Sequence, residues 1–128
     1  KMVSMKEAQK VIQPQKTAST LKKGTDSDLR RYYGVEPSDI KDYLLYIPSE
    51  MMSVEELLIV EAKDKDDVSA IRADVEARLQ SQKKSFESYG TNQMSLLNRA
   101  VVYTRGKYIF FAVSKQAGTW EHKFKELL

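Results

Sequence analysis

The side chains that could carry out catalysis in this chain begin with a single histidine, His122. Cysteine is absent, so the usual pairing of a nucleophile with a base reduces to a serine with His122 or with a lysine. His122 stands between Glu121 and Lys123, off the apolar side of the last helix that we expect, which indicates a solvated side chain. We therefore assign no catalytic residue and expect a protein that is not an enzyme.

The acidic residues offer two other kinds of chemistry, metal binding and hydrolysis. Asp64, Asp66 and Asp67 resemble the start of a calcium loop, but Val68 and Ser69 stand where a ligand and the turn glycine are needed. Carboxylates at the start of a helix explain these residues better, so we expect no metal site. The other acids are scattered, and we leave open whether two of them face each other as in a glycosidase. There is no glycine-rich phosphate loop, and we expect no cofactor.

Two further features favour the binding of a partner. The loop of residues 48–53 joins two expected strands and contains adjacent methionines, which adapt to varied surfaces. Four tyrosines fall within fifteen positions, and tyrosine is enriched at interfaces because its ring is apolar and its end polar. The surface candidates for binding are Tyr32, Tyr33, Tyr46, Met51 and Met52. The alternative for each of them is packing in the core.

The element that organises the rest is a long amphipathic helix, expected over residues 64–90. Its apolar residues recur at steps of three, four or seven, as one side of a helix requires. They are Val68, Ile71, Val75, Leu79, Phe86 and Tyr89. Gly90 is expected to end this helix in the left-handed conformation. The apolar stripe predicts burial against a layer of strands.

Four strands are expected, over residues 43–47, 55–62, 101–104 and 107–113. The last two form a hairpin, because Gly106 supplies the positive φ of a tight turn. Residues 57–60 are apolar on both faces, which is typical of an interior strand or of a face that seeks a partner. The predicted fold class is α+β, with a four-stranded, mainly antiparallel sheet in the order strand–strand–helix, twice over. The long central helix and a C-terminal helix pack on this sheet, after a small helical N-terminal preface.

The chain is expected to divide into an N-terminal segment and one domain. Residues 1–24 read as an N-terminal arm or linker, and residues 25–128 as a single α+β domain. Thr25 with Asp28 predicts the capped start of a short helix that Gly34 ends. As a hypothesis, the sheet face away from the long helix is covered by the arm or by a second copy of the chain, so a homo-oligomer is one option.

The composition excludes some partners. The 128 residues have a net charge of +3, with acids and bases alternating along most segments, so we expect no nucleic-acid binding. No apolar run approaches the ~20 residues that span a membrane. The chain starts at Lys1 rather than at methionine, so we expect further sequence upstream, where a signal peptide or anchor would stand.

Several ordered blocks of sequence carry a resemblance to a known family. The blocks are residues 29–35, 43–48, 55–60, 81–90 and 106–113. Together they resemble a family of Gram-positive cell-envelope lipoproteins catalogued only as a domain of unknown function. The resemblance implies an extracytoplasmic domain that is anchored to the outer face of the membrane through a lipidated cysteine upstream of Lys1. It implies no catalytic or binding residues.

The function that we expect is therefore a non-catalytic, extracytoplasmic binding or interaction module of the cell envelope. Its partner would be a protein, a peptide or an envelope component, and its only link to the membrane would be the upstream lipid tether. The alternative is a hydrolase or transferase that acts on cell-wall polymers through carboxylates gathered in space. That alternative predicts a concave site in which two acids from separate elements meet and at least one has a raised pKa.

Overall fold

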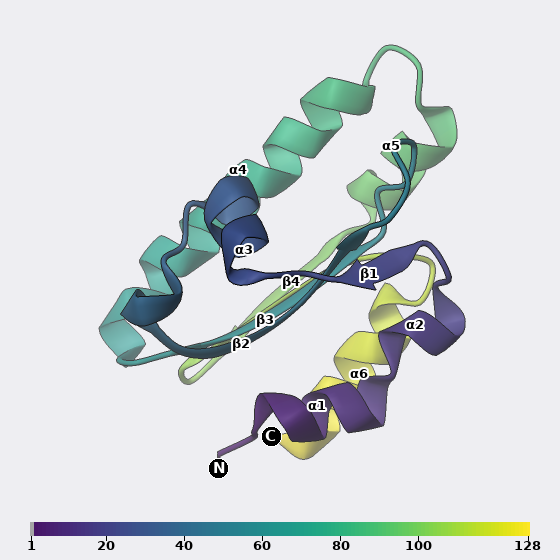
Figure 1. The fold of residues 1–128 in the computed structure, drawn as a ribbon. Coiled ribbons are helices and arrows are strands. Elements are labelled where there is room, and N and C mark those ends of the chain that lie inside the picture. Colours follow the sequence, from purple (N-terminus) through teal and green to yellow (C-terminus); the bar gives the residue numbers. More distant parts are fainter. Residues whose placement is uncertain (1) are drawn as a thin grey trace.

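The sheet at the centre of the protein has five antiparallel strands in the order β1-β2-β3-β5-β4. A computed structural model, which describes residues 2–128, places helices on both faces of this sheet (Figure 1). The strands are β1 (Leu21–Lys23), β2 (Ile40–Pro48), β3 (Glu56–Ala62), β4 (Val101–Arg105) and β5 (Tyr108–Val113). The helices are α1 (Met5–Ile12), α2 (Pro14–Thr17), α3 (Asp26–Tyr33), α4 (Val68–Phe86), α5 (Thr91–Asn98) and α6 (Ala117–Leu127), with single 3₁₀ turns η1 (Pro37–Asp39) and η2 (Lys65–Asp67).

Strands β3 and β5 lie in the middle of the sheet and are buried along their whole length. Their apolar residues face both ways, and Leu58 pairs with Phe111 across the two strands. Of the two alternatives for residues 57–60, an interior strand or a face that seeks a partner, the structure shows the interior strand with both faces covered. Two separate cores result, because alternate residues of one strand point to opposite sides of the sheet.

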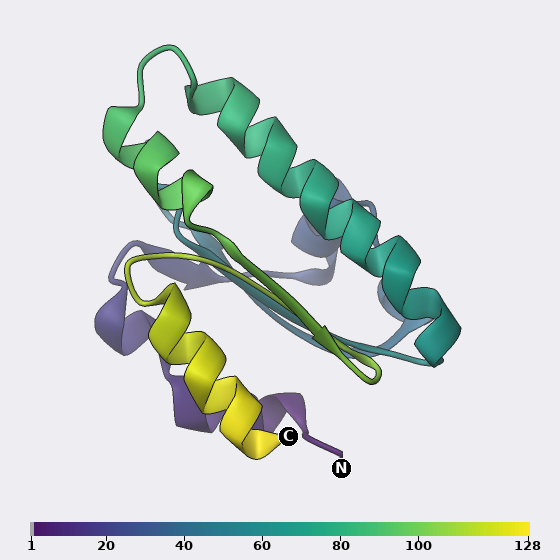
Figure 2. The same cartoon turned by 180° about the vertical axis from the view of Figure 1, so that it is seen from behind.

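Each core is closed by its own group of helices. Helices α3, α4 and α5 cover one face, where Leu29, Leu58 and Phe111 are buried. Helices α1 and α6 cover the other, where Phe110 and Trp120 are buried (Figure 2). The sheet face away from the long helix α4, for which the sequence offered the N-terminal arm or a second copy as cover, is thus covered by α1 and α6 together. The α+β class with an antiparallel sheet and several helices is confirmed.

The number of strands and the order of elements differ from the prediction. A fifth strand, β1, pairs with β2 through Lys22 and Ile47, although residues 1–24 are expected to form an arm or linker. Three residues that include two lysines carry no alternating apolar pattern, so only the unpaired edge of the long β2 makes this segment a strand. The order is also less regular than strand–strand–helix repeated, because β1 and α3 precede β2 and α5 follows α4.

The long helix is shorter than predicted, and one residue of its stripe is exposed. Ile71, Val75 and Phe86 of α4 are buried against the sheet side of the helix, but Tyr89 lies beyond the end of α4 and is 64% exposed. Gly90 has a φ of −117° and is not a left-handed stop. Its small size matters instead, since a Cβ at this position would lie 2.8 Å from Cδ1 of Phe86. Gly90 therefore allows the close approach of the chain to the end of α4.

The N-terminal segment lies on the sheet. Val3, Met5 and Ala8 are buried, and the hydroxyl of Tyr108 accepts a hydrogen bond from the Val3 amide at 2.7 Å. The same hydroxyl donates to the carbonyl of Val3 at 3.1 Å. These contacts attach the start of the chain to β5, and α1 then runs along α6 (Figure 2).

Candidate functional site

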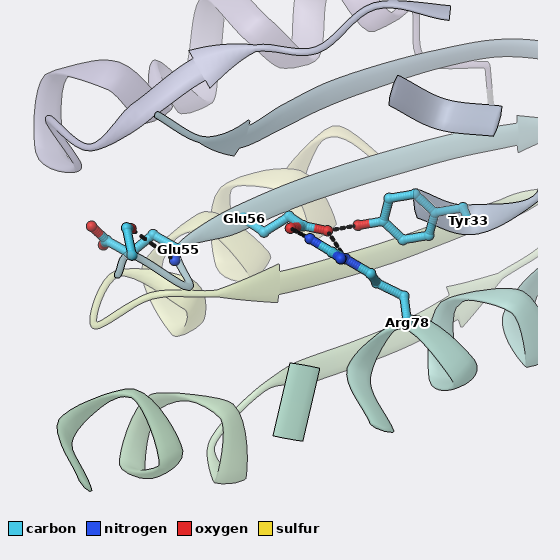
Figure 3. A network of polar contacts seen from close by, with 5 residues as sticks. Tyr33, Glu55, Glu56 and Arg78 are labelled. Carbon is cyan, nitrogen blue, oxygen red and sulfur yellow. Dashed lines mark hydrogen bonds and ion pairs between the residues drawn. The ribbon is translucent and has the colours of Figure 1, made fainter. Parts of the chain in front are cut away.

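A buried ion pair connects the first residue of β3 to the middle of α4. The Arg78 guanidinium donates to both carboxylate oxygens of Glu56, from Nη2 at 2.7 Å and from Nε at 3.1 Å. The hydroxyl of Tyr33, at the end of α3, donates to the same carboxylate. The three side chains converge from three elements, as Figure 3 shows. Glu56 is 1% exposed, so this carboxylate is held entirely by protein groups.

The electrostatics of the group follow from its burial. Burial disfavours the charge on Arg78, but the hydrogen bonds and the charge of Glu56 outweigh it, so the pKa of Arg78 is raised. Burial, and then the negative charge of Glu56, raise the pKa of Tyr33 well above its ordinary value. Arg78 and Glu56 thus form a charged pair with a neutral tyrosine beside them.

Tyr32 extends this group to the surface. The guanidinium of Arg78 lies over the Tyr32 ring, 4.5 Å from its centroid, and that of Arg31 lies 5.5 Å from it. Helix α3 therefore directs Tyr33 inward and Tyr32 outward. Its capping box, Thr25 with Asp28, and the left-handed Gly34 that ends it confirm the predicted helix and position both tyrosines.

A hollow of about 480 Å³ opens beside Tyr32, between α3, α4 and the loop from β2 to β3. We call it the arginine hollow. Its lining includes Arg31, Tyr32, Met51, Arg78, Gln82 and Phe86. Arg78 is held by its bidentate contact with Glu56, whereas Arg31 is exposed and forms no ion pair with any carboxylate of residues 2–128. The hollow combines a fixed cation, a second and exposed cation, the exposed carboxylate of Glu50, an aromatic ring and apolar atoms.

The predicted binding residues are separated by the fold. Tyr32 and Met51 both line the arginine hollow, and Met51 is 93% exposed. Met52 is 46% exposed on the same loop, and its carbonyl accepts a hydrogen bond from Gln93 of α5. Tyr33 and Tyr46 are buried, one in each core, so they are not surface residues. The hydroxyl of Tyr46 accepts a hydrogen bond from Gln9 at 2.7 Å.

Sequence reasoning missed Arg31, Glu56 and Arg78. One signal was available for Glu56, a charged residue next to the apolar run of residues 57–60, because a carboxylate inside a buried strand needs a partner. Arg78 lies on α4 at the margin of the apolar stripe and was not distinguishable from other charged residues of the helix. Nothing in the linear sequence pairs these two residues.

Glu55, next to Glu56, points to another part of the molecule (Figure 3). Its carboxylate accepts hydrogen bonds from Thr20 at 2.8 Å and from Ser114 at 2.7 Å. These contacts join the segment before β1, the start of β3 and the end of β5. Glu55 therefore links three segments that are distant in sequence, and its role is structural.

A second hollow, of about 360 Å³, is acidic. Its lining includes Glu36 and Asp39 around η1, and Asp67 and Asp74 at the start of α4. Burial raises the pKa of Asp74. Arg30 pairs with Glu36 at 2.8 Å. Within residues 2–128 no group of three or more such side chains is arranged to hold a metal ion.

The remaining sequence candidate, His122, is exposed on α6. Its Nε2 lies 3.4 Å from Glu126, one turn along the helix. Both side chains are surrounded by solvent, which is the setting expected from the sequence. None of the helices within residues 2–128 has the length and apolar character needed to cross a bilayer.

Comparison with known proteins gives one match. Residues 15–114 match a family model described as Domain of unknown function (DUF4358). The match includes every strand, α3 to α5 and the whole lining of the arginine hollow, and it ends before α6. No curated protein and no solved structure matches the chain.

Proposed function

We propose that this chain, which belongs to the DUF4358 family, is a non-catalytic binding module that holds an acidic partner group in the arginine hollow. One observation carries the proposal. Arg78 is oriented by the buried Glu56 and stacked on Tyr32, so a nearly buried cation stands at the wall of an open hollow. Orienting a guanidinium in this way reduces the entropy that a ligand loses on binding beside it.

The ligand class follows from the lining. Arg31 supplies the free positive charge, and a guanidinium suits a carboxylate or phosphate because two of its N–H groups can donate in parallel. Met51 and Phe86 supply apolar contact next to it. The ligand would therefore carry an acidic group beside an apolar part, as a protein, a peptide or an envelope component does.

The location that we propose is extracytoplasmic, at the cell envelope. Its support is the resemblance of five blocks of sequence to Gram-positive envelope lipoproteins. In this proposal a lipidated cysteine upstream of Lys1 tethers the domain to the outer face of the membrane. A basic domain in that position meets anionic surfaces, which suits a hollow with two arginines.

Titration followed by NMR tests the hollow. The probes are N-acetyl-Leu-Glu and inorganic pyrophosphate. The first is too short to pair as a strand, and the second has no peptide backbone. We expect the amide signals of Tyr32 and Gln82 to shift with either or both probes. Arg31→Ala should weaken binding about fivefold, which corresponds to roughly 1 kcal/mol for a partly solvated charge contact.

The matched control is Arg72→Ala. Arg72 is also an exposed arginine, on α4, and it pairs only with Glu76, at 2.9 Å. This variant should bind as the unmodified protein does. The proposal is contradicted if neither probe shifts Tyr32 and Gln82, or if both variants lose affinity equally.

A second candidate function is hydrolysis or group transfer on cell-wall polymers. The observation that favours it is the acidic hollow, which acids from η1 and from α4 line and where burial raises the pKa of Asp74. Incubation with purified wall polymer tests it. Release of fragments that stops in Asp74→Asn, but continues in the control Asp66→Asn on the exposed turn η2, would establish this candidate. We expect no fragments from any of the three proteins.

A further inference from the structure

The two edges of the sheet are protected to different degrees. The β1 edge has three residues, of which Lys22 and Lys23 are exposed. The β4 edge has five, and the first four are the β-favouring Val101, Val102, Tyr103 and Thr104. Short length and lysines are common devices that prevent pairing at an edge. β4 has neither, nor a proline or a bulge in its pairing with β5.

The direction of the free hydrogen-bonding groups on β4 follows from its register. Arg105 pairs with Tyr108 across a two-residue turn whose first residue, Gly106, has a φ of +58°. In such a hairpin the residues that flank the turn exchange hydrogen bonds, and every second residue does so after them. Val102 and Thr104 therefore direct their amides and carbonyls away from β5.

These outward groups have no backbone partner within residues 2–128. The helices do not close the edge either. In Figure 2, β4 runs along the front of the sheet, with α4 above it and α6 below it. The side chains of residues 101–104 are half-buried by these helices. The backbone edge is left as a template for one more strand.

Basic side chains surround this edge. Arg99 precedes β4, Arg105 ends it and Lys107 is in the turn, and all three are exposed. None of them forms an ion pair with a carboxylate in the described part of the chain. A hollow of about 350 Å³ beside the turn is lined by Arg105 and Lys107, and also by Lys41 and Glu61, which pair with each other at 3.6 Å. The charge is complementary to an acidic segment.

The same charges oppose pairing with a second copy. An antiparallel pair of β4 strands that overlaps fully is centred on Tyr103. It brings Arg99 of one copy close to Lys107 of the other, and the same again by symmetry. Like charges in apposition destabilise a strand pair. A partner with carboxylates at these positions is attracted by Arg99 and Lys107, whereas a second copy is repelled there.

We infer that the β4 edge, through the outward amides and carbonyls of Val102 and Thr104 and the flanking Arg99, Arg105 and Lys107, binds an acidic extended segment of another protein as a sixth strand. Main-chain hydrogen bonds provide the affinity and the basic residues select the charge. This surface is separate from the arginine hollow, so the inference does not depend on the proposed function.

Hydrogen exchange measured by NMR tests the inference at the two amides concerned. The probe is a soluble peptide of about seven residues in which glutamate alternates with valine, matched to the length of β4. At a peptide concentration ten times its Kd, the amides of Val102 and Thr104 should exchange about tenfold more slowly, because only about a tenth of the edge remains free. A peptide with lysine in place of glutamate should bind at least about tenfold more weakly.

Two controls separate strand pairing from charge attraction. Thr104→Pro removes one outward amide but no bond of the ladder to β5, and it should abolish the protection of Val102. The glutamate peptide with every backbone nitrogen methylated keeps its charge and should give no protection, a result that does not depend on the folding of a variant.

Three results would overturn the inference. The first is unchanged exchange of Val102 and Thr104 at saturating peptide, even if the signals of Tyr32 and Gln82 move. The second is equal protection by the lysine or methylated peptide. The third is protection that already exists without peptide and grows with protein concentration, which would assign the edge to a second copy. None of these results tests ligand binding in the arginine hollow, which is followed through the amide signals of Tyr32 and Gln82.

Discussion

On the α4 side of the sheet, a carboxylate and a guanidinium are buried together, whereas the interior on the α6 side is apolar and includes a group of packed aromatic rings. Phe110 stacks on Phe124 with ring centroids 5.6 Å apart, and the Trp120 indole donates to Thr17 at 3.2 Å. The two faces belong to the same strands. Glu56 and Leu57 are neighbours in sequence, and the first points to α4 while the second lies in the α6 core.

The two faces differ in what they offer to a ligand. An apolar core is stable because it excludes water, and it offers nothing to a ligand. A buried ion pair is costly to desolvate and contributes little net stability, but it holds Arg78 in a fixed orientation beside Tyr32 and the hollow. In our proposal the α4 face therefore combines packing with ligand binding, whereas the α6 face provides packing alone. The following experiments test that contrast.

The largest effect is expected at Glu56. Glu56→Ala should lower the free energy of unfolding by about 4 kcal/mol, because Arg78 stays buried without its partner. The double variant with Glu56→Met and Arg78→Met should recover most of this loss, since apolar residues of similar volume replace the pair. Urea unfolding measures both. A double variant as unstable as the single one would mean that the ion pair itself stabilises the fold.

On the α6 face, a substitution that changes the shape of a side chain but not its polarity should lower the free energy of unfolding by less. Phe124→Leu leaves an apolar side chain of similar volume in the α6 core and should cost about 1.5 kcal/mol. Arg78→Met alone serves as its counterpart on the α4 face, and it should cost more because Glu56 then loses its partner. Equal costs for the two variants would remove the contrast between the faces.

Stability at high pH should depend on Tyr33 more than on Tyr46. Burial and the charge of Glu56 raise the pKa of Tyr33, whereas burial alone raises that of Tyr46 and its hydrogen bond with Gln9 lowers it. A raised folded pKa gives stability that is complete below about pH 10, the unfolded value, and is lost as the pH rises above it. Each such tyrosine should contribute up to about 1.4 kcal/mol of loss per pH unit.

Unfolding by urea between pH 9 and pH 11 measures this loss in Tyr33→Phe and in Tyr46→Phe. The first variant should flatten the alkaline decline more than the second. The reverse order would indicate that the Glu56 charge does not reach Tyr33 with the strength that the structure implies.

The smallest effects concern two glycines, one on each side. Gly90→Ala should cost about 1 kcal/mol, because the added Cβ lies 2.8 Å from Phe86 at the end of α4. Gly118→Ala should stabilise the protein by about 0.5 kcal/mol, since its Cβ meets nothing within 4 Å and alanine favours the helix. Thermal unfolding measures both. A gain at Gly90 would show that the α4 end is loosely packed.

Local features of the sequence predicted several elements well. Thr25, Asp28 and Gly34 define α3, and Gly106 defines the hairpin of β4 and β5. The apolar side of α6, with Trp120 and Phe124, is buried as its spacing indicates. These predictions succeed because capping, turns and helical periodicity depend on residues within a few positions of each other.

The sequence alone determined the α+β class, the capped helix, the hairpin and the apolar character of both faces of residues 57–60. Only the tertiary structure decided that residues 21–23 form a strand, that Tyr33 is buried and Tyr32 is not, and that Glu56 meets Arg78. The reason is physical: β1 exists through its pairing with β2, and a carboxylate in a buried strand is satisfied by a residue 22 positions away. Such contacts depend on the register of packed elements, which no local spacing encodes.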